Sequence, residues 1–256
     1  MVNFLFLEMT LMLLSEFYKF IFIKTHKTAS TAVELALEPY CAPPDHLIFP
    51  NRRNPLISDY GIIGARAPGV AMRLESQNDV TFFWNHMSAK KIIQRISYEK
   101  FMSMRRLTSV RNPFSRLVSQ FYYQQACSKN KIPEISSDLS EARNQFDRWL
   151  HDYEESGLKN GCKKIHRAKS DYSLVHFGGK FIVTDFVRVE SIKDDLNAFC
   201  GKCGIDANCL KISSERDNSA NKKFNVKQLF CSSSMIDQAR KIDSWVFELD
   251  LYPDAP

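Results

Sequence analysis

Eight consecutive polar and small residues have the composition of an anion-binding loop: Lys24, Thr25, His26, Lys27, Thr28, Ala29, Ser30 and Thr31. An apolar run ends just before them at Ile23, and a run of good helix formers follows over residues 31–38. A loop that leads from a strand into a helix presents unpaired backbone N–H groups and the positive end of the helix dipole. Because two lysines and four hydroxyl side chains are added to it, we predict that this loop binds a phosphate or sulfate group. The alternative is an ordinary polar turn in which serine and threonine cap the helix.

The loop differs from the phosphate loop of nucleoside triphosphatases. It contains no glycine, whereas that motif requires two. No predicted apolar strand ends in an aspartate suited to hold magnesium, which disfavours a magnesium-dependent kinase. Sulfuryl transfer needs no metal, because the cations of the protein can balance the charge. A small-molecule or nucleotide kinase on a similar α/β scaffold remains the alternative enzyme.

A second pair of residues could bind a second phosphate. Arg111 ends a predicted strand at 107–110, and Asn112 with Pro113 has the pattern of a helix N-cap followed by a first helical residue. Ser119 lies two helical turns beyond Asn112, on the side of the helix that faces the end of the strand. A guanidinium and a hydroxyl at this place can hold one phosphate group. The alternative is that Arg111 pairs with a carboxylate while Ser119 faces solvent.

A histidine follows the predicted strand at 80–84. His86 would lie at the carboxyl edge of the sheet, and an ordinary histidine pKa of about 6.5 suits a general base at neutral pH. The alternative is a structural histidine held by hydrogen bonds.

Taken together, these segments resemble the sulfotransferases that use 3′-phosphoadenosine 5′-phosphosulfate (PAPS). They are most similar to the branch that contains galactose-3-O- and heparan-sulfate 2-O-sulfotransferases and many bacterial relatives. Residues 24–31 resemble the family's 5′-phosphosulfate loop, 109–119 its 3′-phosphate site, 83–88 the segment that supplies its base, and 186–196 the segment after its late strand. The resemblance covers residues from about 20 to 203.

The resemblance implies a P-loop-like sulfotransferase fold and in-line transfer of a sulfuryl group from PAPS to a hydroxyl or amine, without a metal. It implies that His86 is the base and that Lys27 contacts the transferring group and the leaving oxygen. The whole loop from Lys24 to Thr31, with Arg111 and Ser119, would bind the donor and its product, adenosine 3′,5′-bisphosphate. The acceptor would be a small molecule or a saccharide. A third reading is a non-catalytic protein that keeps the nucleotide pocket for partner binding.

The elements that would position these residues alternate between strand and helix. This order predicts an α/β fold with a central, mostly parallel sheet flanked by helices. Strands are expected at 20–23, 80–84, 107–110 and 181–187, and helices at 31–38, after Pro113, and at 140–153, 191–203 and 234–248. Ser191 and Asp194 have the spacing of a capping box for the fourth of these helices. Segments 41–78 and 128–139 are expected to be irregular and to build the acceptor side. The resemblance also implies that residues 213–223 close over the nucleotide.

The length of 256 residues predicts one domain over 1–256. The net charge of +6 comes from dispersed residues, which favours a small anionic ligand and argues against nucleic acid. Residues 1–14 are apolar but have no basic start and are interrupted by Glu8, so we expect a packed element with a signal peptide as the alternative. Seven irregularly spaced cysteines favour buried thiols in a cytoplasmic protein, with a zinc site at Cys200, Cys203 and Cys209 as the alternative. No other segment approaches the roughly 18 consecutive apolar residues of a spanning helix, so we expect no membrane as a partner. The oligomeric state cannot be read from these features.

Overall fold

The computed structural model describes residues 12–47, 55–65, 83, 86–127, 134–158, 171–206, 208, 210–212 and 223–256. The chain forms two compact units. The first unit comprises Met1–Val110 and Ser173–Glu215, and the second comprises Arg111–Tyr172 and Arg216–Pro256. Each unit is described by itself.

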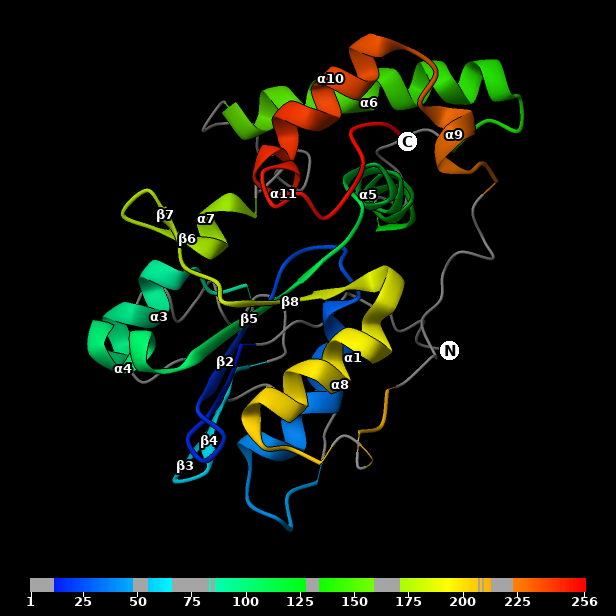
Figure 1. The fold of residues 1–256 in the computed structure, drawn as a ribbon. Coiled ribbons are helices and arrows are strands. Elements are labelled where there is room, and N and C mark those ends of the chain that lie inside the picture. The colour runs from blue at the N-terminus through cyan, green and yellow to red at the C-terminus, as the bar shows by residue number, and fades with distance from the viewer. Residues whose placement is uncertain are drawn as a thin grey trace. The chain divides into compact units, whose positions relative to one another are not determined.

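The first unit contains a six-stranded sheet in the order β3-β4-β1-β2-β5-β8 (Figure 1). The strands are β1 (Leu13–Ser15), β2 (Phe20–Ile23), β3 (Leu56–Ser58), β4 (Gly61–Ile63), β5 (Arg105–Val110) and β8 (Asp185–Arg188). The pairs β2–β5 and β5–β8 are parallel, whereas β1–β2, β1–β4 and β3–β4 are antiparallel. The predicted α/β class is confirmed, and short antiparallel strands extend the parallel half of the sheet.

Strand β2 shows why the sequence prediction was correct at the centre of the sheet. All four side chains of Phe20–Ile23 are fully buried, as a continuous apolar run covered on both faces requires. Its parallel partner β5 places Ile23 opposite Thr108. The segments that follow β2 and β5 therefore leave the same carboxyl edge of the sheet.

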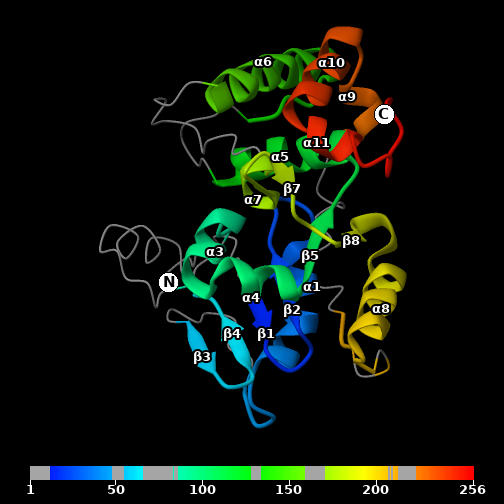
Figure 2. The same ribbon diagram turned by 60° about the vertical axis from the view of Figure 1, so that its left-hand side comes forward.

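Helices cover the sheet of the first unit on both sides (Figure 2). Helices α1 (Ser30–Leu37) and α8 (Ile192–Cys203) share one apolar core with β2, in which Phe20 meets Phe199 edge to face. Helices α3 (Ala89–Ile96) and α4 (Tyr98–Ser103) lie on the opposite side (Figure 2). The unit also contains a small two-stranded sheet of β6 (His176–Phe177) and β7 (Lys180–Phe181), preceded by the short helix α7 (Tyr172–Val175).

The segment around β8 differs in detail from its prediction. The single strand expected at 181–187 is divided into β7 and β8. The predicted capping box is wrong, because Ser191 makes no side-chain cap and its Oγ donates to the Asp195 carboxylate at 3.0 Å. The Arg188 guanidinium also donates to Asp195 and lowers the pKa of that carboxyl.

Some expected segments lie partly outside the described residues. Of the strand expected at 80–84, only Phe83 is described. The segment 41–78 is less irregular than expected, since it contains β3 and β4. Of 128–139, the described part runs without regular structure from residue 134 until α6 begins, and of 213–223 only Lys223 is described, where it donates to the Ile135 carbonyl at 2.9 Å.

The second unit is helical in its described part. It contains α5 (Pro113–Cys127), α6 (Leu139–Leu158), α9 (Val226–Leu229), α10 (Ser233–Ile242) and α11 (Ser244–Phe247). Its core is aromatic, with Phe146 packed against Phe121, Trp149 and Phe230. The single helix expected at 234–248 is interrupted at Asp243.

A buried ion pair lies at this interruption. Arg116 of α5 and Asp243 are both almost completely buried, and the Arg116 Nε donates to Asp243 Oδ2 at 2.5 Å. Burial raises the pKa of Asp243, and Arg116 offsets this only in part. Burial lowers the pKa of Arg116, but the combined effect of Asp243, Tyr153 and Asp171 is larger and in the opposite direction. The net pKa of Arg116 is therefore raised. The buried charge of Arg116 in α5 is thus balanced by Asp243, the residue at which the chain breaks between α10 and α11.

The described cysteines follow the expectation of buried thiols only in part, since Cys41 and Cys200 are buried, Cys203 is half-buried and Cys231 is exposed. The described cysteines include Cys41, Cys200, Cys203 and Cys231, all with free thiols. Burial raises the pKa of Cys200 to about 12 and of Cys203 to about 11, which disfavours the thiolates that zinc requires. Among the described helices, none has the combination of length and apolar character needed to span a bilayer.

Candidate functional site

The predicted anion loop connects β2 to α1. Lys27 and Ala29 adopt left-handed backbone conformations, with φ of 60° and 49°. Ala29 occupies the N-cap position of α1 and is exposed, and no side chain caps the helix there. The Ser30 hydroxyl instead donates to the Thr25 carbonyl at 2.8 Å, which closes the loop on itself. No side chain therefore occupies the N-cap of α1, where the positive end of the helix dipole favours an anion.

The backbone at Ala29 leads to a stability prediction. A left-handed alanine is strained by its Cβ, and glycine is not. We expect Ala29→Gly to raise the free energy of unfolding by about 0.5–1 kcal/mol. Ala32→Gly, inside α1, should lower it by about 1 kcal/mol. Chemical denaturation followed by circular dichroism compares the two, and a loss of stability in both variants would contradict the strain at Ala29.

Two threonines of the loop face the sheet. The Thr25 Oγ1 donates to the Ser109 carbonyl of β5 at 2.5 Å, and the Thr28 Oγ1 lies 2.8 Å from the Ser109 Oγ. The Oγ1 atoms of Thr25 and Thr28 are also 2.8 Å apart. All three residues are buried. These hydroxyl groups hold the loop against the carboxyl end of β5. The two threonine side chains therefore support the loop from its buried side.

Lys24 also points inward. Its side chain is fully buried, and its Nζ donates to Glu34 Oε2 at 2.5 Å and to Thr31 Oγ1 at 3.0 Å. The lysine thus joins the loop to α1 as half of a buried ion pair. Lys27, by contrast, is only half-buried, so it is the better placed of the two loop lysines to contact an anion in solvent.

His86 lies against the loop, although it is about 60 residues away in sequence. Its Nδ1 is 2.9 Å from the Lys24 carbonyl oxygen. Its ring stacks on that of His26, with centroids 3.5 Å apart and planes inclined by 13°. His86 has a φ of 43°, in the left-handed region that is uncommon for residues other than glycine. The structure therefore brings the predicted base and the predicted anion loop together within the first unit.

The predicted 3′-phosphate residues belong to the second unit. Arg111 lies two residues before the start of α5, and Ser119 lies within the helix; both are half-buried. The predicted cap at the start of this helix is confirmed, because Asn112 Oδ1 accepts a hydrogen bond from the Ser115 N–H at 3.1 Å and Pro113 is the first helical residue.

Sequence reasoning missed Glu34, and it did not predict the contacts of Ser109, which it placed in the segment 109–119. The Glu34 carboxylate of α1 pairs with the Lys24 ammonium, and Ser109 forms hydrogen bonds with hydroxyl groups of the loop. A signal for Glu34 was present, since a carboxylate four residues after Ser30 and three before Leu37 lies on the apolar face of the helix. A buried carboxylate of this kind needs a cationic partner.

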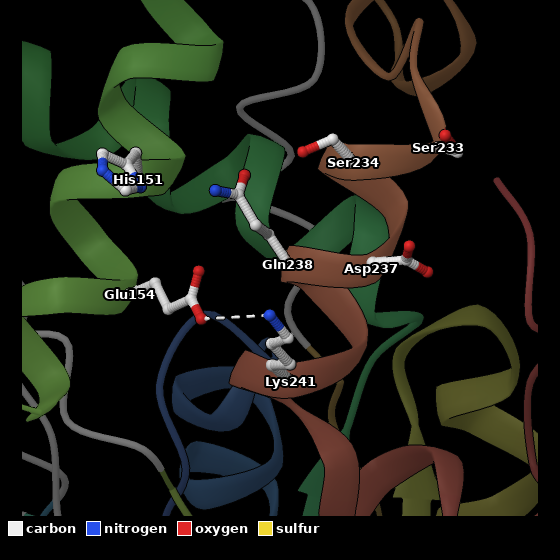
Figure 3. A pocket seen from close by; sticks show the side chains of 7 residues that line it. All are labelled: His151, Glu154, Ser233, Ser234, Asp237, Gln238 and Lys241. Atoms are coloured by element: carbon white, nitrogen blue, oxygen red, sulfur yellow. Dashed lines mark ion pairs between the residues drawn. The ribbon is translucent and has the colours of Figure 1, made fainter.

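The second unit also contains an open cavity of about 610 Å³ between α6 and α10 (Figure 3). His151 and Glu154 line it from α6, and Ser234, Gln238 and Lys241 from α10. An ion pair joins Glu154 to Lys241 at 3.8 Å across it (Figure 3). None of the predicted site residues lines this cavity.

One comparison with known proteins finds a family for the chain. The model of the sulfotransferase family matches residues 11–249, a range that runs through both units. No curated protein and no solved structure matches the chain.

Proposed function

Because the chain belongs to the sulfotransferase family, and so to the enzymes that transfer sulfuryl groups, we propose that it uses PAPS as the donor and a hydroxyl or amine of a small molecule or saccharide as the acceptor. The observation that carries the proposal is the β2–α1 loop with His86 held against it. A base and an anion site at one sheet edge are what sulfuryl transfer requires.

The residues present fit the donor. The N-terminus of α1, which no side chain caps at the exposed Ala29, and the half-buried Lys27 beside it suit a 5′-phosphosulfate. Arg111 and Ser119 are the residues that would hold the 3′-phosphate. The donor, when bound, supplies the sulfuryl group and a phosphate leaving group. Lys24, Thr25 and Thr28 keep the loop in shape through their buried contacts.

His86 would act as the base. A carbonyl oxygen can only accept, so in the neutral ring Nδ1 donates to the Lys24 carbonyl and Nε2 carries no proton. The acceptor gives its proton to Nε2 while its oxygen or nitrogen bonds to sulfur, and the bond from sulfur to the 5′-phosphate oxygen breaks with its electrons going to that oxygen. The Lys27 ammonium stabilises the negative charge that grows on this oxygen.

A thermal-shift experiment tests the donor. Adenosine 3′,5′-bisphosphate at about 100 times its Kd should stabilise the protein by about 2.7 kcal/mol, which corresponds to a rise in Tm of about 5–10 °C. No magnesium should be needed, and ATP should not stabilise the protein comparably. If ATP with magnesium raises the Tm and the bisphosphate does not, the kinase reading replaces the proposal.

Matched lysine variants locate the effect. Lys27→Met should lose more than half of the bisphosphate-induced shift, because a charge-assisted hydrogen bond is worth about 1.5–3 kcal/mol. Lys19→Met, which removes an exposed lysine outside the loop, should keep the full shift. Mass spectrometry of PAPS reactions with a panel of alcohols, sugars and amines then identifies the acceptor class. Binding of the bisphosphate without transfer to any acceptor or to water would favour the non-catalytic reading.

A further inference from the structure

A buried carboxylate lies behind the predicted anion loop. We propose that Glu34 sets the affinity of this loop for anions, because it cancels the charge of Lys24, and that it thereby allows the charged product to leave. The inference rests on the proposed function, since the anions that the site would hold are the donor and adenosine 3′,5′-bisphosphate.

The ion pair of Lys24 and Glu34 is completely enclosed by the protein. Both side chains have no exposed surface, and the Lys24 Nζ donates to Glu34 Oε2 at 2.5 Å. Lys24 is the first residue after β2, whereas Glu34 lies on the buried face of α1, about one turn beyond the start of the helix. The pair therefore joins the two elements between which the loop runs.

The ammonium of Lys24 lies close to the place where an anion would bind. Its Nζ also donates to the Thr31 hydroxyl oxygen at 3.0 Å, and Thr31 is the second residue of α1. In the first turn of a helix, backbone N–H groups and the helix dipole favour an anion. A net charge on the buried pair would act on that anion through the protein interior, which screens charges much less than water does.

Glu34 determines how much of the Lys24 charge reaches the anion. In the wild type the carboxylate lies against the ammonium, so an anion in the loop meets a pair whose charges largely cancel. The donor and its product each carry several negative charges, and a further uncompensated cation would hold both of them more tightly. Product release limits the turnover of many enzymes, so a moderate affinity of the loop favours turnover.

The sign of the effect follows from charge alone. Glu34→Gln keeps the size of the side chain and an oxygen that can accept from Lys24, but it removes one negative charge. Lys24→Met keeps the length of the side chain and removes one positive charge. These changes in charge hold whatever else the two side chains contact. The double variant removes both charges and returns the net charge of the pair to that of the wild type.

Isothermal titration calorimetry with adenosine 3′,5′-bisphosphate tests the inference. One unit charge at about 10 Å in a protein interior changes the affinity for an anion by about tenfold. We therefore expect the Kd to fall about tenfold in Glu34→Gln and to rise about tenfold in Lys24→Met, while the double variant stays within about threefold of the wild type. Inhibition of transfer by the bisphosphate should become stronger in Glu34→Gln in the same proportion.

Glu16→Gln is the matched control. It makes the same chemical change in the same unit, but at the opposite end of β2 and in a partly exposed ion pair with Lys19. Its Kd should stay within about twofold of the wild type, because exposed charges at a distance are screened by water and salt. Circular dichroism and the Tm without ligand verify that each variant is folded. If one single variant does not fold, the other single variant and the double variant still give the sign of the effect.

A pair that only supports the loop gives a different pattern of affinities. Weaker binding in both single variants would show that the pair keeps the loop in shape and does not tune its charge. An unchanged Kd in Glu34→Gln would show that the charge of Glu34 does not reach the anion. Either result overturns the inference.

Inorganic pyrophosphate, titrated into the same variants, separates these results from a failure of the proposed function, because it requires only an anion in the loop. If no variant binds the bisphosphate but the affinities for pyrophosphate follow the expected order, the donor is wrong and the role of Glu34 stands. If the wild type binds neither ligand, both the proposed function and this inference are wrong.

Discussion

His86→Asn is expected to lower kcat/KM by about 10²–10⁴-fold, the range that a positioned general base contributes. Asparagine is a suitable replacement, because it tolerates the left-handed backbone found at this position. Its side-chain amide can also donate to the Lys24 carbonyl, which accepts from His86 in the wild type. What asparagine cannot do is take up a proton from the acceptor, so the variant removes the chemistry and keeps the local structure.

Binding measurements separate this loss from a loss of the donor site. The variant should show the same bisphosphate-induced rise in Tm as the wild type, since His86 is held by the loop and does not form it. His151→Asn, at an exposed position in α6, should retain full turnover. If His86→Asn keeps its kcat/KM, another group accepts the proton and His86 is a structural histidine.

Local signals account for the part of the site that the sequence predicted. The fully apolar, β-branched and aromatic run Phe20–Ile23 is typical of a central strand, and Asn112 with Pro113 marks the start of α5 within one residue. These patterns depend on neighbours in the chain, so one sequence suffices to read them. The position of the anion loop followed from the same reasoning.

Local sequence patterns did not predict the directions in which the side chains of the site point. Lys24 and Lys27 are indistinguishable as residue types, yet the first is buried against Glu34 and the second is half-buried. The stack of His26 on His86 joins segments about 60 residues apart, and no local pattern encodes a contact across such a separation. The left-handed residues of the site also run against local propensity, as expected where tertiary contacts and function override it.

The helix predicted at 234–248 failed for a related reason. Its apolar spacing continues through Asp243, but the chain leaves the helix there and Asp243 pairs with Arg116, 127 residues earlier. A charged residue on a predicted apolar face was the signal. Such a residue is rarely fully buried unless it is paired.

The Arg116–Asp243 pair should therefore be the most sensitive point of the second unit. Arg116→Met leaves Asp243 without its cation, and Asp243→Asn leaves Arg116 with only the weaker effects of Tyr153 and Asp171, in a site where both side chains are almost completely buried. We expect each to lower the free energy of unfolding by about 3–5 kcal/mol. The double variant should lose less than the sum of the two, because no unpaired charge remains from the pair. Denaturation followed by the fluorescence of Trp149 and Trp245, both in the second unit, measures these losses.

The loss of unfolding free energy should depend on pH in one of the two single variants and not in the other. Burial already raises the pKa of Asp243 in the presence of Arg116, and loss of the cation should raise it further. A carboxyl whose pKa is raised on folding destabilises the protein most above the folded-state pKa, and the penalty shrinks as the pH falls from there towards the unfolded-state pKa. The loss caused by Arg116→Met should accordingly shrink between pH 8 and pH 5, whereas the loss caused by Asp243→Asn should not, because the guanidinium of Arg116 stays charged throughout.

Arg240→Met, which breaks the exposed pair with Asp237 on α10, should cost no more than about 0.5 kcal/mol at any pH. Losses at Arg116 as small as that at Arg240, or independent of pH, would mean that water reaches the pair and that it does not hold the unit together.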